Sequence, residues 1–475
     1  GPGLTNALTG IAEAAKSRTP MLVLAGDVPA GAVRNNFHFD QAAMTRSVGA
    51  VAERIHSPAT AREDTLRAVT RALRDRQTVV LSLPTDVQDA MLAGNLPPLA
   101  LPAAPGPHYP DPESVRRLAE AIVKAKRPVF IGGRGAVISG AQAAIAKLAE
   151  QAGALLSTSV CGHGLFAGDP WNLGICGGFA SPAASALVGE ADLIVGFGVS
   201  LTHWTTKRGK LIAPGTVVAQ IDIEGGKLGY HTPVDIAVLA DAGAAAEAVL
   251  AELGARTGAG GWRDTRTAAG LRDCSHHNAP NRNVPAGGVI SPRPVSKDGE
   301  AMLPEARVVA SDSGHFCGWP PRYLGVPNAR SSCLSHSFQS VGLGLASAIG
   351  LGIANPGSLV VLGAGDGGFL MSLADLETAV RLKLRMCVLV YNDASYAAEV
   401  HLFKRRGMST DIVPFPDTDF AAIARGHGAR AATVRTLEDL APLRAWVGEG
   451  APGVFVIDGK ISPDLEADWH AEHFP

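Results

Sequence analysis

The sequence has few of the features that would mark a secreted, zinc-stapled, nucleic-acid-binding or membrane protein. Its six cysteines are scattered and form no C-x-x-C pair, so we expect neither a disulfide framework nor a structural zinc site. A formal net charge of −2 gives no electrostatic reason to expect nucleic acid or an anionic membrane as a partner. The most apolar stretch, residues 341–354, is interrupted by glycine and too short to span a bilayer. We recognise no signal peptide and predict a protein of the reducing cytoplasm.

The composition favours an α/β protein with several cores. The chain has 475 residues, which is too long for one core, and its 55 glycines are typical of a turn-rich fold. Continuous apolar segments alternate with helical patterns, as expected for parallel sheets covered by helices on both faces. We predict three doubly wound parallel-sheet domains in a row. The expected strands are residues 21–25, 78–83, 128–132, 191–196, 216–222, 307–310, 358–362, 386–391 and 453–457.

Two segments without periodicity divide the chain. Residues 93–110 are rich in proline and alanine, and residues 255–290 are polar and irregular, so we predict that both are linkers. Asp111 and Pro112 would begin the first helix after the first linker. The predicted domains are residues 1–92, 111–254 and 291–475. The first is shorter than the usual domain of about 100–150 residues, and we expect it to be incomplete.

The segment with the most specific chemistry is a glycine-rich turn after a buried strand. Residues 358–369 read S-L-V-V-L-G-A-G-D-G-G-F, and such a turn lets backbone N–H groups approach a phosphate. Gly363, Gly365 and Gly368 also fit the G-x-G-x-x-G pattern of dinucleotide-binding proteins, with Asp393 where a ribose-binding acid could lie. Alternatively, the glycines serve only a tight turn.

A carboxylate in the middle of this turn favours a phosphate that is bridged by a metal. Asp366 would repel a bound pyrophosphate unless a cation lay between them. Mg²⁺ is a hard cation that takes carboxylate and phosphate oxygens together. Asn392 and Asp393 follow the next expected strand, and the carboxyl ends of parallel strands meet at one edge of a sheet. We therefore expect Asp366 and Asp393 to share a Mg²⁺ site.

These residues resemble the signature of thiamine-diphosphate-dependent enzymes, in which G-D-G is followed by an N-N or N-D pair at this distance. The likeness is closest to the group of acetolactate synthase, benzoylformate decarboxylase and the 2-oxo-acid carboligases. It implies a pyrimidine-binding, a central and a diphosphate-binding domain. Further matching segments follow the family's order over nearly the whole chain, at residues 1–10, 79–87, 127–135, 191–198, 217–224, 309–319 and 337–350.

The resemblance implies thiamine diphosphate and Mg²⁺ as cofactors. Mg²⁺ would be held by the side chains of Asp366 and Asp393 and by the carbonyl oxygen of Ser395. Relatives usually have Asn at the position of Asp393, but a second carboxylate still suits a hard cation. Val341 lies where relatives place Met, Leu or Ile as a support between the two rings of the cofactor. The expected cofactor-binding residues are Asn6, Ser313, Gly314, His315, Phe316, Gln339, Val341, Gly365, Asp366, Gly367, Gly368, Asp393, Ser395 and Tyr396.

Two features of relatives have no counterpart in this sequence. Relatives activate the cofactor with a Glu upstream of the G-P-G motif, which here spans residues 1–3. That Glu would precede Gly1, so we assign no catalytic residue, and neither Glu13 nor Glu53 is proposed in its place. Flavin-containing acetolactate synthases carry an Arg-Phe-Asp-Asp-Arg-like run in the central domain, where residues 199–205 read V-S-L-T-H-W-T. We therefore predict that FAD is not bound.

The activity that the resemblance implies is decarboxylation of a small 2-oxo acid, followed by joining of the product to a second carbonyl compound. A decarboxylase that joins no second molecule is the nearest alternative. A cofactor-binding protein without turnover and a nicotinamide-dependent dehydrogenase are alternatives from other classes. In this family the active site lies between domains of two subunits, so we expect a homodimer or a homotetramer.

Overall fold

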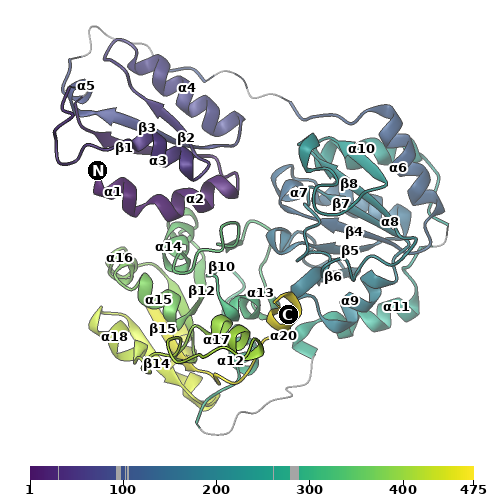
Figure 1. Ribbon diagram of the computed structural model, residues 1–475. Coiled ribbons are helices and arrows are strands. Elements are labelled where there is room, and N and C mark those ends of the chain that lie inside the picture. Colours follow the sequence, from purple (N-terminus) through teal and green to yellow (C-terminus); the bar gives the residue numbers. More distant parts are fainter. Residues whose placement is uncertain are drawn as a thin grey trace. The chain divides into compact units, whose positions relative to one another are not determined.

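The computed structural model describes residues 1–29, 31–91, 98–101, 103, 106–259, 261–278 and 288–474 (Figure 1). They contain three parallel sheets, which confirms the predicted fold class. The chain divides into two compact units, Gly1–Gly106 with Ser335–Ser340, and Pro107–Leu334 with Val341–Pro475. The described part of the chain has no helix long and apolar enough to cross a membrane.

The first unit contains a three-stranded parallel sheet in the order β1-β3-β2. Strands β1 (Met21–Asp27) and β3 (Thr78–Pro84) were predicted from their apolar runs, whereas β2 (Val51–Arg54) was not. Strand β2 carries Glu53 and Arg54 among its four residues. It is therefore not a continuous apolar run, and such runs were the basis of the strand prediction. The helices of this unit are α1 (Pro2–Asn6), α2 (Leu8–Lys16), α3 (Gln41–Ser47), α4 (Ala61–Arg74) and α5 (Thr85–Gln88).

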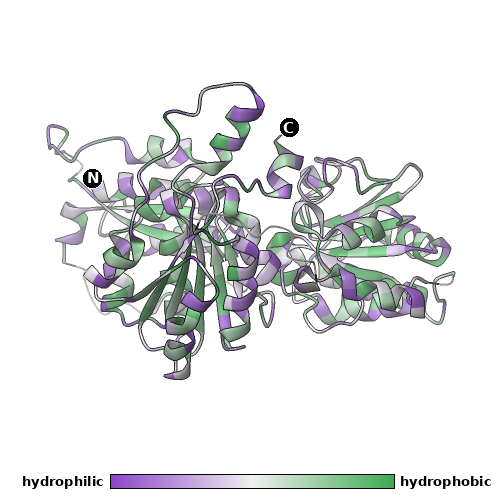
Figure 2. Cartoon of the chain, turned by 90° about the horizontal axis from the view of Figure 1, so that it is seen from below, coloured by the Kyte–Doolittle hydropathy of each residue, from purple (hydrophilic) through white to green (hydrophobic). Residues whose placement is uncertain are grey.

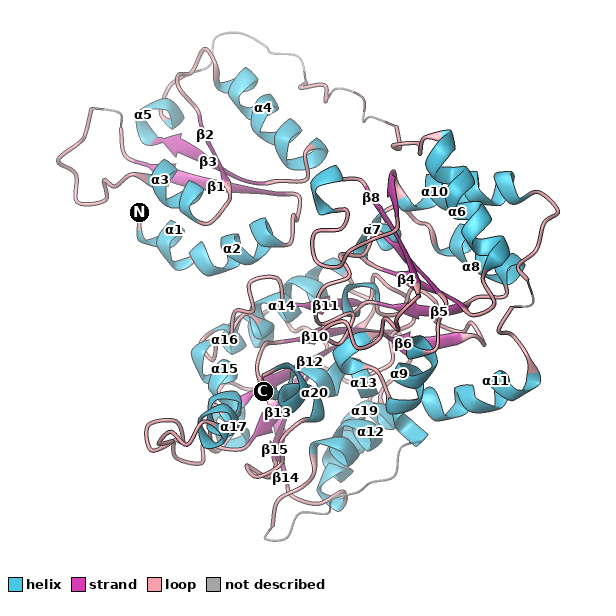
Figure 3. Cartoon of the chain, turned by 45° about the vertical axis from the view of Figure 1, so that its right-hand side comes forward, coloured by secondary structure: helices cyan, strands magenta, loops and turns pink. Residues whose placement is uncertain are grey.

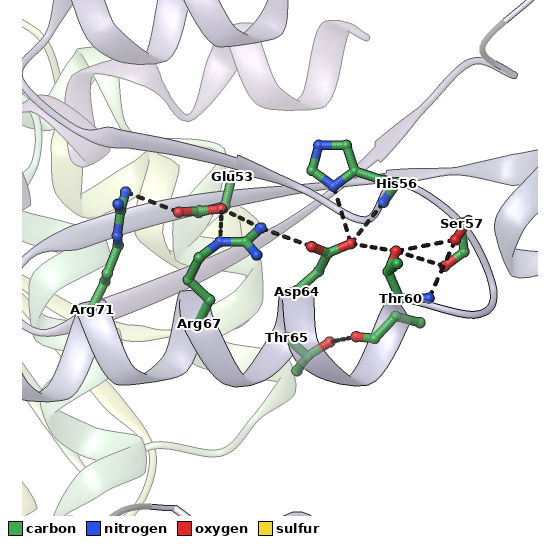
Figure 4. Close-up of polar contacts among 9 residues, drawn as sticks. Glu53, His56, Ser57, Thr60, Asp64, Thr65, Arg67 and Arg71 are labelled. Atoms are coloured by element: carbon green, nitrogen blue, oxygen red, sulfur yellow. Dashed lines mark hydrogen bonds and ion pairs between the residues drawn. The ribbon is translucent and has the colours of Figure 1, made fainter.

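An ion-pair network joins strand β2 to helix α4 (Figure 4). The Glu53 carboxylate, whose side chain is 7% exposed, lies between Arg67 and Arg71 at 2.9 Å from each. Arg67 also donates to Asp64 at 2.8 Å, and Asp64 accepts the backbone N–H of His56 at 2.9 Å. Burial alone would raise the pKa of Asp64, but these hydrogen bonds together hold that pKa below its usual value. A charged strand is therefore tolerated because its charge is neutralised by the helix beside it.

We expect Asp64→Asn to destabilise the first unit by about 1–3 kcal/mol, because a buried carboxylate that accepts several hydrogen bonds is lost. Because the pKa of Asp64 is lower in the folded state, this stabilisation is full at pH 7 and is lost as the pH falls below 3.8. Urea unfolding at pH 7 measures it. Glu63→Gln, on the exposed face of the same helical turn, is the control, and an equal loss in both variants would contradict the assignment.

The middle sheet has six parallel strands in the order β6-β5-β4-β7-β8-β9. Helices α6 (Pro112–Lys124), α8 (Gln142–Ala152) and α10 (Ala242–Leu253) cover one face, and α9 (Pro182–Gly189) covers the other. Asp111 caps α6 as predicted, because its side chain accepts the Ser114 N–H. The strands are β4 (Pro128–Gly132), β5 (Leu155–Thr158), β6 (Asn172–Ile175), β7 (Leu193–Phe197), β8 (Val217–Asp222) and β9 (Ile236–Leu239), and α7 (Arg134–Ile138) follows β4.

Part of the second predicted linker packs on this sheet. Helix α11 (Thr265–Gly270) lies within it, and Trp262 and Cys274 are buried against the face that α9 covers. Such contacts are made by single residues in a polar segment, so they produce no periodic apolar pattern from which they could be predicted. Residues 260 and 279–287, and residues 93–97, 102, 104 and 105, lie outside the described residues, and the domain boundaries stay predictions.

The C-terminal sheet also has six parallel strands, in the order β11-β10-β12-β13-β15-β14 (Figure 3). Its strands are mostly hydrophobic in Figure 2, as expected for a sheet that is buried on both faces. The strands are β10 (Arg307–Ser311), β11 (Ser332–Leu334), β12 (Leu359–Gly365), β13 (Met386–Asn392), β14 (Arg430–Val434) and β15 (Val454–Lys460). One face is covered by α12 (Pro292–Met302), α13 (Trp319–Tyr323) and α19 (Ala441–Gly448), and the other by α14 (Gly344–Ala354), α16 (Asp375–Arg381) and α18 (Phe420–Gly426).

Helix α20 (Asp468–His473) contacts both the middle and the C-terminal parts of the second unit. Its Trp469 is 2% exposed and packs edge-on against Phe179 of the middle part, with 5.6 Å between ring centroids. The same ring lies 4.5 Å from that of Trp319, which belongs to the C-terminal part. The Arg322 guanidinium lies over Trp469 at 4.4 Å and pairs with Asp468. Trp469 thus connects the two sheets through aromatic contacts.

Candidate functional site

The two predicted metal ligands lie at the carboxyl edge of the C-terminal sheet. Strand β12 ends at Gly365, and helix α15 (Asp366–Met371) begins directly after it. The neighbouring strand β13 pairs with β12 in parallel, Gly365 opposite Tyr391, and ends at Asn392. Asp366 and Asp393 therefore follow adjacent strands at the same edge, as the sequence predicts.

The electrostatics of this pair fit a bound cation. Asp366 is 3% exposed, and burial raises its pKa to about 6. Burial and then the nearby charge of Asp366 raise the pKa of Asp393 well above its usual value. One oxygen of Asp366 accepts the Gly367 N–H at 2.7 Å, while Oδ2 is buried with no hydrogen-bond partner among the described residues. Two carboxylates that repel each other, one of them buried with an unsatisfied oxygen, are stabilised by a hard cation.

The donor set at this site is two carboxylates with backbone groups around them. In the part of the chain that the structure describes, no three His, Cys, Asp or Glu side chains converge so that they could hold a metal. A cation here would complete its shell with backbone carbonyls, water and ligand oxygens, which is how Mg²⁺ is commonly bound. The Ser395 hydroxyl donates to Asp393 at 3.0 Å, and the role of the Ser395 carbonyl oxygen stays a prediction.

Asn392 and Tyr396 support the two loops. The buried Asn392 amide donates to Asp458 at 2.9 Å and to the Thr418 carbonyl at 3.1 Å, so it anchors the end of β13. The ring of Tyr396 lies against the glycine-rich turn. A Cβ atom on Gly367 would lie 2.4 Å from Cε1 of Tyr396, so this close approach requires glycine. The predicted residues Asp366, Gly367 and Tyr396 are thus brought together.

The loop after β10 carries the predicted residues Ser313, Gly314, His315 and Phe316. Phe316 lies against Gly365, where an added Cβ would come within 2.9 Å of its ring. The Ser313 N–H, expected to face a diphosphate, donates instead to the Asp312 carboxylate at 2.8 Å. The loop therefore adjoins the glycine-rich turn, but one of its expected donors is already used. Sequence reasoning passed over Asp312, although it begins the D-x-G segment.

Val341 and Gly368 also lie near each other, because a Cβ on Gly368 would lie 3.1 Å from Cγ1 of Val341. Val341 is 39% exposed.

Asn6 and Gln339 belong to the first compact unit, whereas the other expected cofactor residues belong to the second. The roles of Asn6 and Gln339 stay predictions.

His315 is buried and its side chain faces the C-terminal segment. Its Nε2 accepts the Ala467 N–H at 2.9 Å, and its backbone carbonyl accepts the Trp469 Nε1–H at 3.2 Å, so neither of these groups is available to a ligand. The His401 ring lies at 4.8 Å and the His470 ring at 5.3 Å between centroids. Burial, followed by the charges of these two histidines, lowers the pKa of His315 to about 3.

We expect the second unit to lose stability as the pH falls from 6.5 towards 3, because His315 is neutral when folded and protonates readily when unfolded. One such proton contributes at most about 1.4 kcal/mol per pH unit. Melting temperatures between pH 7.5 and 5 measure the slope, which His315→Gln should reduce. His38→Gln, at an exposed position, should leave it unchanged. An unchanged slope in His315→Gln would contradict the prediction.

Comparison with known proteins gives three matching family models. They are the N-terminal TPP binding domain of thiamine pyrophosphate enzymes (residues 1–44), their central domain (115–249) and their C-terminal TPP binding domain (312–458). A sulfoacetaldehyde acetyltransferase of Rhodobacter capsulatus is 28% identical over 98% of this chain and 83% of its own length. An acetolactate synthase large subunit of Lactococcus lactis is 29% identical over 90% and 75%, respectively. A probable acetolactate synthase large subunit of Methanocaldococcus jannaschii is 26% identical over 91% and 75%.

Proposed function

This chain belongs to the thiamine pyrophosphate enzyme family, and we propose that it decarboxylates a small 2-oxo acid and joins the product to a second carbonyl compound. Thiamine diphosphate would be held through Mg²⁺ by Asp366 and Asp393. The observation that carries the proposal is the pair of neighbouring carboxylates at the edge of the C-terminal sheet, in which Oδ2 of Asp366 is buried with no hydrogen-bond partner among the described residues.

Each part of the site has a role that follows from its chemistry. When bound, thiamine diphosphate would supply the nucleophilic carbon and the electron sink that decarboxylation of a 2-oxo acid needs. Asp366 and Asp393 would hold the cation that neutralises its diphosphate. Phe316 packs against Gly365 and Tyr396 packs against Gly367 of the glycine-rich turn. Val341 offers apolar surface to the rings.

Backbone hydrogen bonds in the middle sheet support the prediction that no flavin is bound. A dinucleotide diphosphate needs free backbone N–H groups at the turn after a strand such as β4. Here the Gly133 N–H donates to the Phe197 carbonyl at 3.0 Å, and the Gly135 N–H donates to the Gly198 carbonyl at 2.9 Å. We therefore keep the prediction that FAD is not bound, and an absorbance band of flavin in the purified protein would refute it.

The activity is tested by product analysis. The protein is incubated with thiamine diphosphate, Mg²⁺ and pyruvate, 2-oxobutyrate or benzoylformate, each alone and with sulfoacetaldehyde, since one relative is named a sulfoacetaldehyde acetyltransferase. Carboligation of two pyruvate molecules releases one CO₂ and leaves acetolactate. We expect CO₂ release together with a condensed product.

The other outcomes distinguish the alternatives. Release of CO₂ with an aldehyde as the sole product would favour a decarboxylase that joins no second molecule. Binding of thiamine diphosphate without turnover of any substrate pair would favour a cofactor-binding protein. A stabilisation by NAD and none by thiamine diphosphate would favour a dehydrogenase and overturn the proposal.

We also propose that the protein acts as a homodimer or a homotetramer. Support comes from the family, whose active sites form between subunits. Light scattering coupled to size-exclusion chromatography measures the mass of the particle directly. A monomer that turns over substrate would contradict this part of the proposal.

A further inference from the structure

Asp312 lies at the junction of three segments at the carboxyl edge of the C-terminal sheet. It directly follows β10 and is completely buried. Its backbone N–H donates to the carbonyl oxygen of Gly363 on β12 at 3.0 Å, which fixes the residue against the next strand. A carboxylate buried in this way is costly unless it accepts hydrogen bonds.

The Asp312 carboxylate accepts its hydrogen bonds from backbone groups. Besides the Ser313 N–H, it accepts the N–H of Gly342 at 2.9 Å, and it is hydrogen-bonded to the backbone of Leu343 and Gly344. Gly342–Gly344 form the turn that leads into α14, where the first N–H groups of a helix have no partner within the helix. A Cβ atom on Gly344 would lie 2.5 Å from Cβ of Asp312, so the turn approaches Asp312 as closely as glycine allows.

The same carboxylate lies beside the glycine-rich turn and beside Val341. A Cβ atom on Gly368 would lie 2.6 Å from Oδ2 of Asp312 and 3.1 Å from Cγ1 of Val341. Val341 immediately precedes the turn that Asp312 holds, and its side chain is 39% exposed beside the buried Ser340. The position of this apolar side chain therefore depends on the hydrogen bonds of Asp312.

We propose that Asp312 is a positioning residue, whose carboxylate holds the turn at residues 342–344 and thereby fixes Val341 as the support for the rings of thiamine diphosphate. This inference rests on the proposed function, because it requires thiamine diphosphate as the ligand. The Asp312 carboxylate accepts the N–H groups of Ser313 and Gly342, and Gly342 directly follows Val341. Loss of the Asp312 carboxylate should therefore weaken the binding of the thiamine diphosphate rings, which Val341 supports.

The test compares two ligands and two variants by calorimetric titration at saturating Mg²⁺. In Asp312→Asn the affinity for thiamine diphosphate should fall about tenfold or more, because the turn that carries Val341 would then adopt the binding-competent conformation in only about a tenth of the molecules or fewer. Inorganic pyrophosphate lacks the rings, and its affinity should change by less than about threefold. A purely structural defect would weaken both ligands alike.

Asp192→Asn is the matched control. Asp192 accepts two consecutive backbone N–H groups, those of Lys126 and Arg127, both at 2.8 Å, and it lies in the middle part of the second unit. This variant should melt at a lower temperature but bind both ligands like the unmutated protein. Unchanged thiamine diphosphate binding in Asp312→Asn would overturn the inference, and so would an equal loss for pyrophosphate.

The unmutated protein provides a second test that does not depend on a stable variant. Without any ligand, the amide hydrogens of Gly342, Leu343 and Gly344 should already be protected from exchange with deuterium, because Asp312 holds them. Rapid exchange that slows only when the cofactor binds would overturn the inference. If the unmutated protein bound pyrophosphate but not thiamine diphosphate, the proposed function would fail and this inference with it.

Discussion

Asp366→Ala will remove the thermal stabilisation that thiamine diphosphate and Mg²⁺ give to the unmutated protein. A ligand that binds only the folded state stabilises it by about 2.7 kcal/mol when its concentration is a hundred times its dissociation constant. Without Asp366, the cation would have one carboxylate ligand and bind more weakly, so the diphosphate would lose the positive charge that neutralises it. Melting curves with and without both ligands measure the effect, and we expect no shift in the variant.

The melting temperature of Asp366→Ala without ligands provides a second and more specific test of the site. Because Asp366 and Asp393 raise each other's cost of ionisation, the removal of one carboxylate should leave the ligand-free melting temperature at least as high as in the unmutated protein. Asp375→Ala, at an exposed position in the first turn of α16, is the control and should keep the full ligand-induced shift. A full shift in Asp366→Ala would refute the metal site.

Trp469→Ala is expected to have the largest effect on the stability of the second unit. The ring is 2% exposed and contacts Phe179, Trp319 and the Arg322 guanidinium. Truncation of a buried Trp to Ala leaves a cavity and costs about 3–5 kcal/mol. Since the ring joins the middle and C-terminal sheets, their unfolding should also become less cooperative. Urea unfolding, followed by circular dichroism, measures both the free energy and the slope of the transition.

Phe474→Ala tests whether this effect belongs to the buried ring. Phe474 lies five residues further along the same segment, but it is 40% exposed. Its truncation should cost less than about 1 kcal/mol, as is usual for surface substitutions. A loss for Phe474→Ala as large as that for Trp469→Ala would show that the whole segment, and not the aromatic junction, is the sensitive element.

The sequence predicted all the inner strands of the sheets except β5, and it missed most of the edge strands. Strands β4, β7, β12 and β13 are buried on both faces, so each is a continuous apolar run. Strands at the edges, such as β14, are short or partly exposed and lack such a run. The other missed strands are β2, β5, β6, β9 and β11.

The metal pair was predictable because it depends on topology alone. Adjacent parallel strands bring their carboxyl ends together, so Asp366 and Asp393 are neighbours whatever the details of the loops. The role of Asp312 depends instead on a hydrogen bond to Gly342, thirty positions away in the chain, which no local pattern encodes. The burial of His315 is similar, because it is caused by Ala467 and the segment around it.

The carboxylates of Asp366 and Asp393 have a consequence for how the protein should be refolded. They come together only when β12 and β13 pair, so like charges are brought together in the course of folding itself. At the proposed metal site, uptake of a cation would then be coupled to this stage of folding. A chelating refolding buffer would oppose that stage, whereas millimolar magnesium would favour it. Recovery of protein from inclusion bodies should therefore depend on the divalent ion in the buffer.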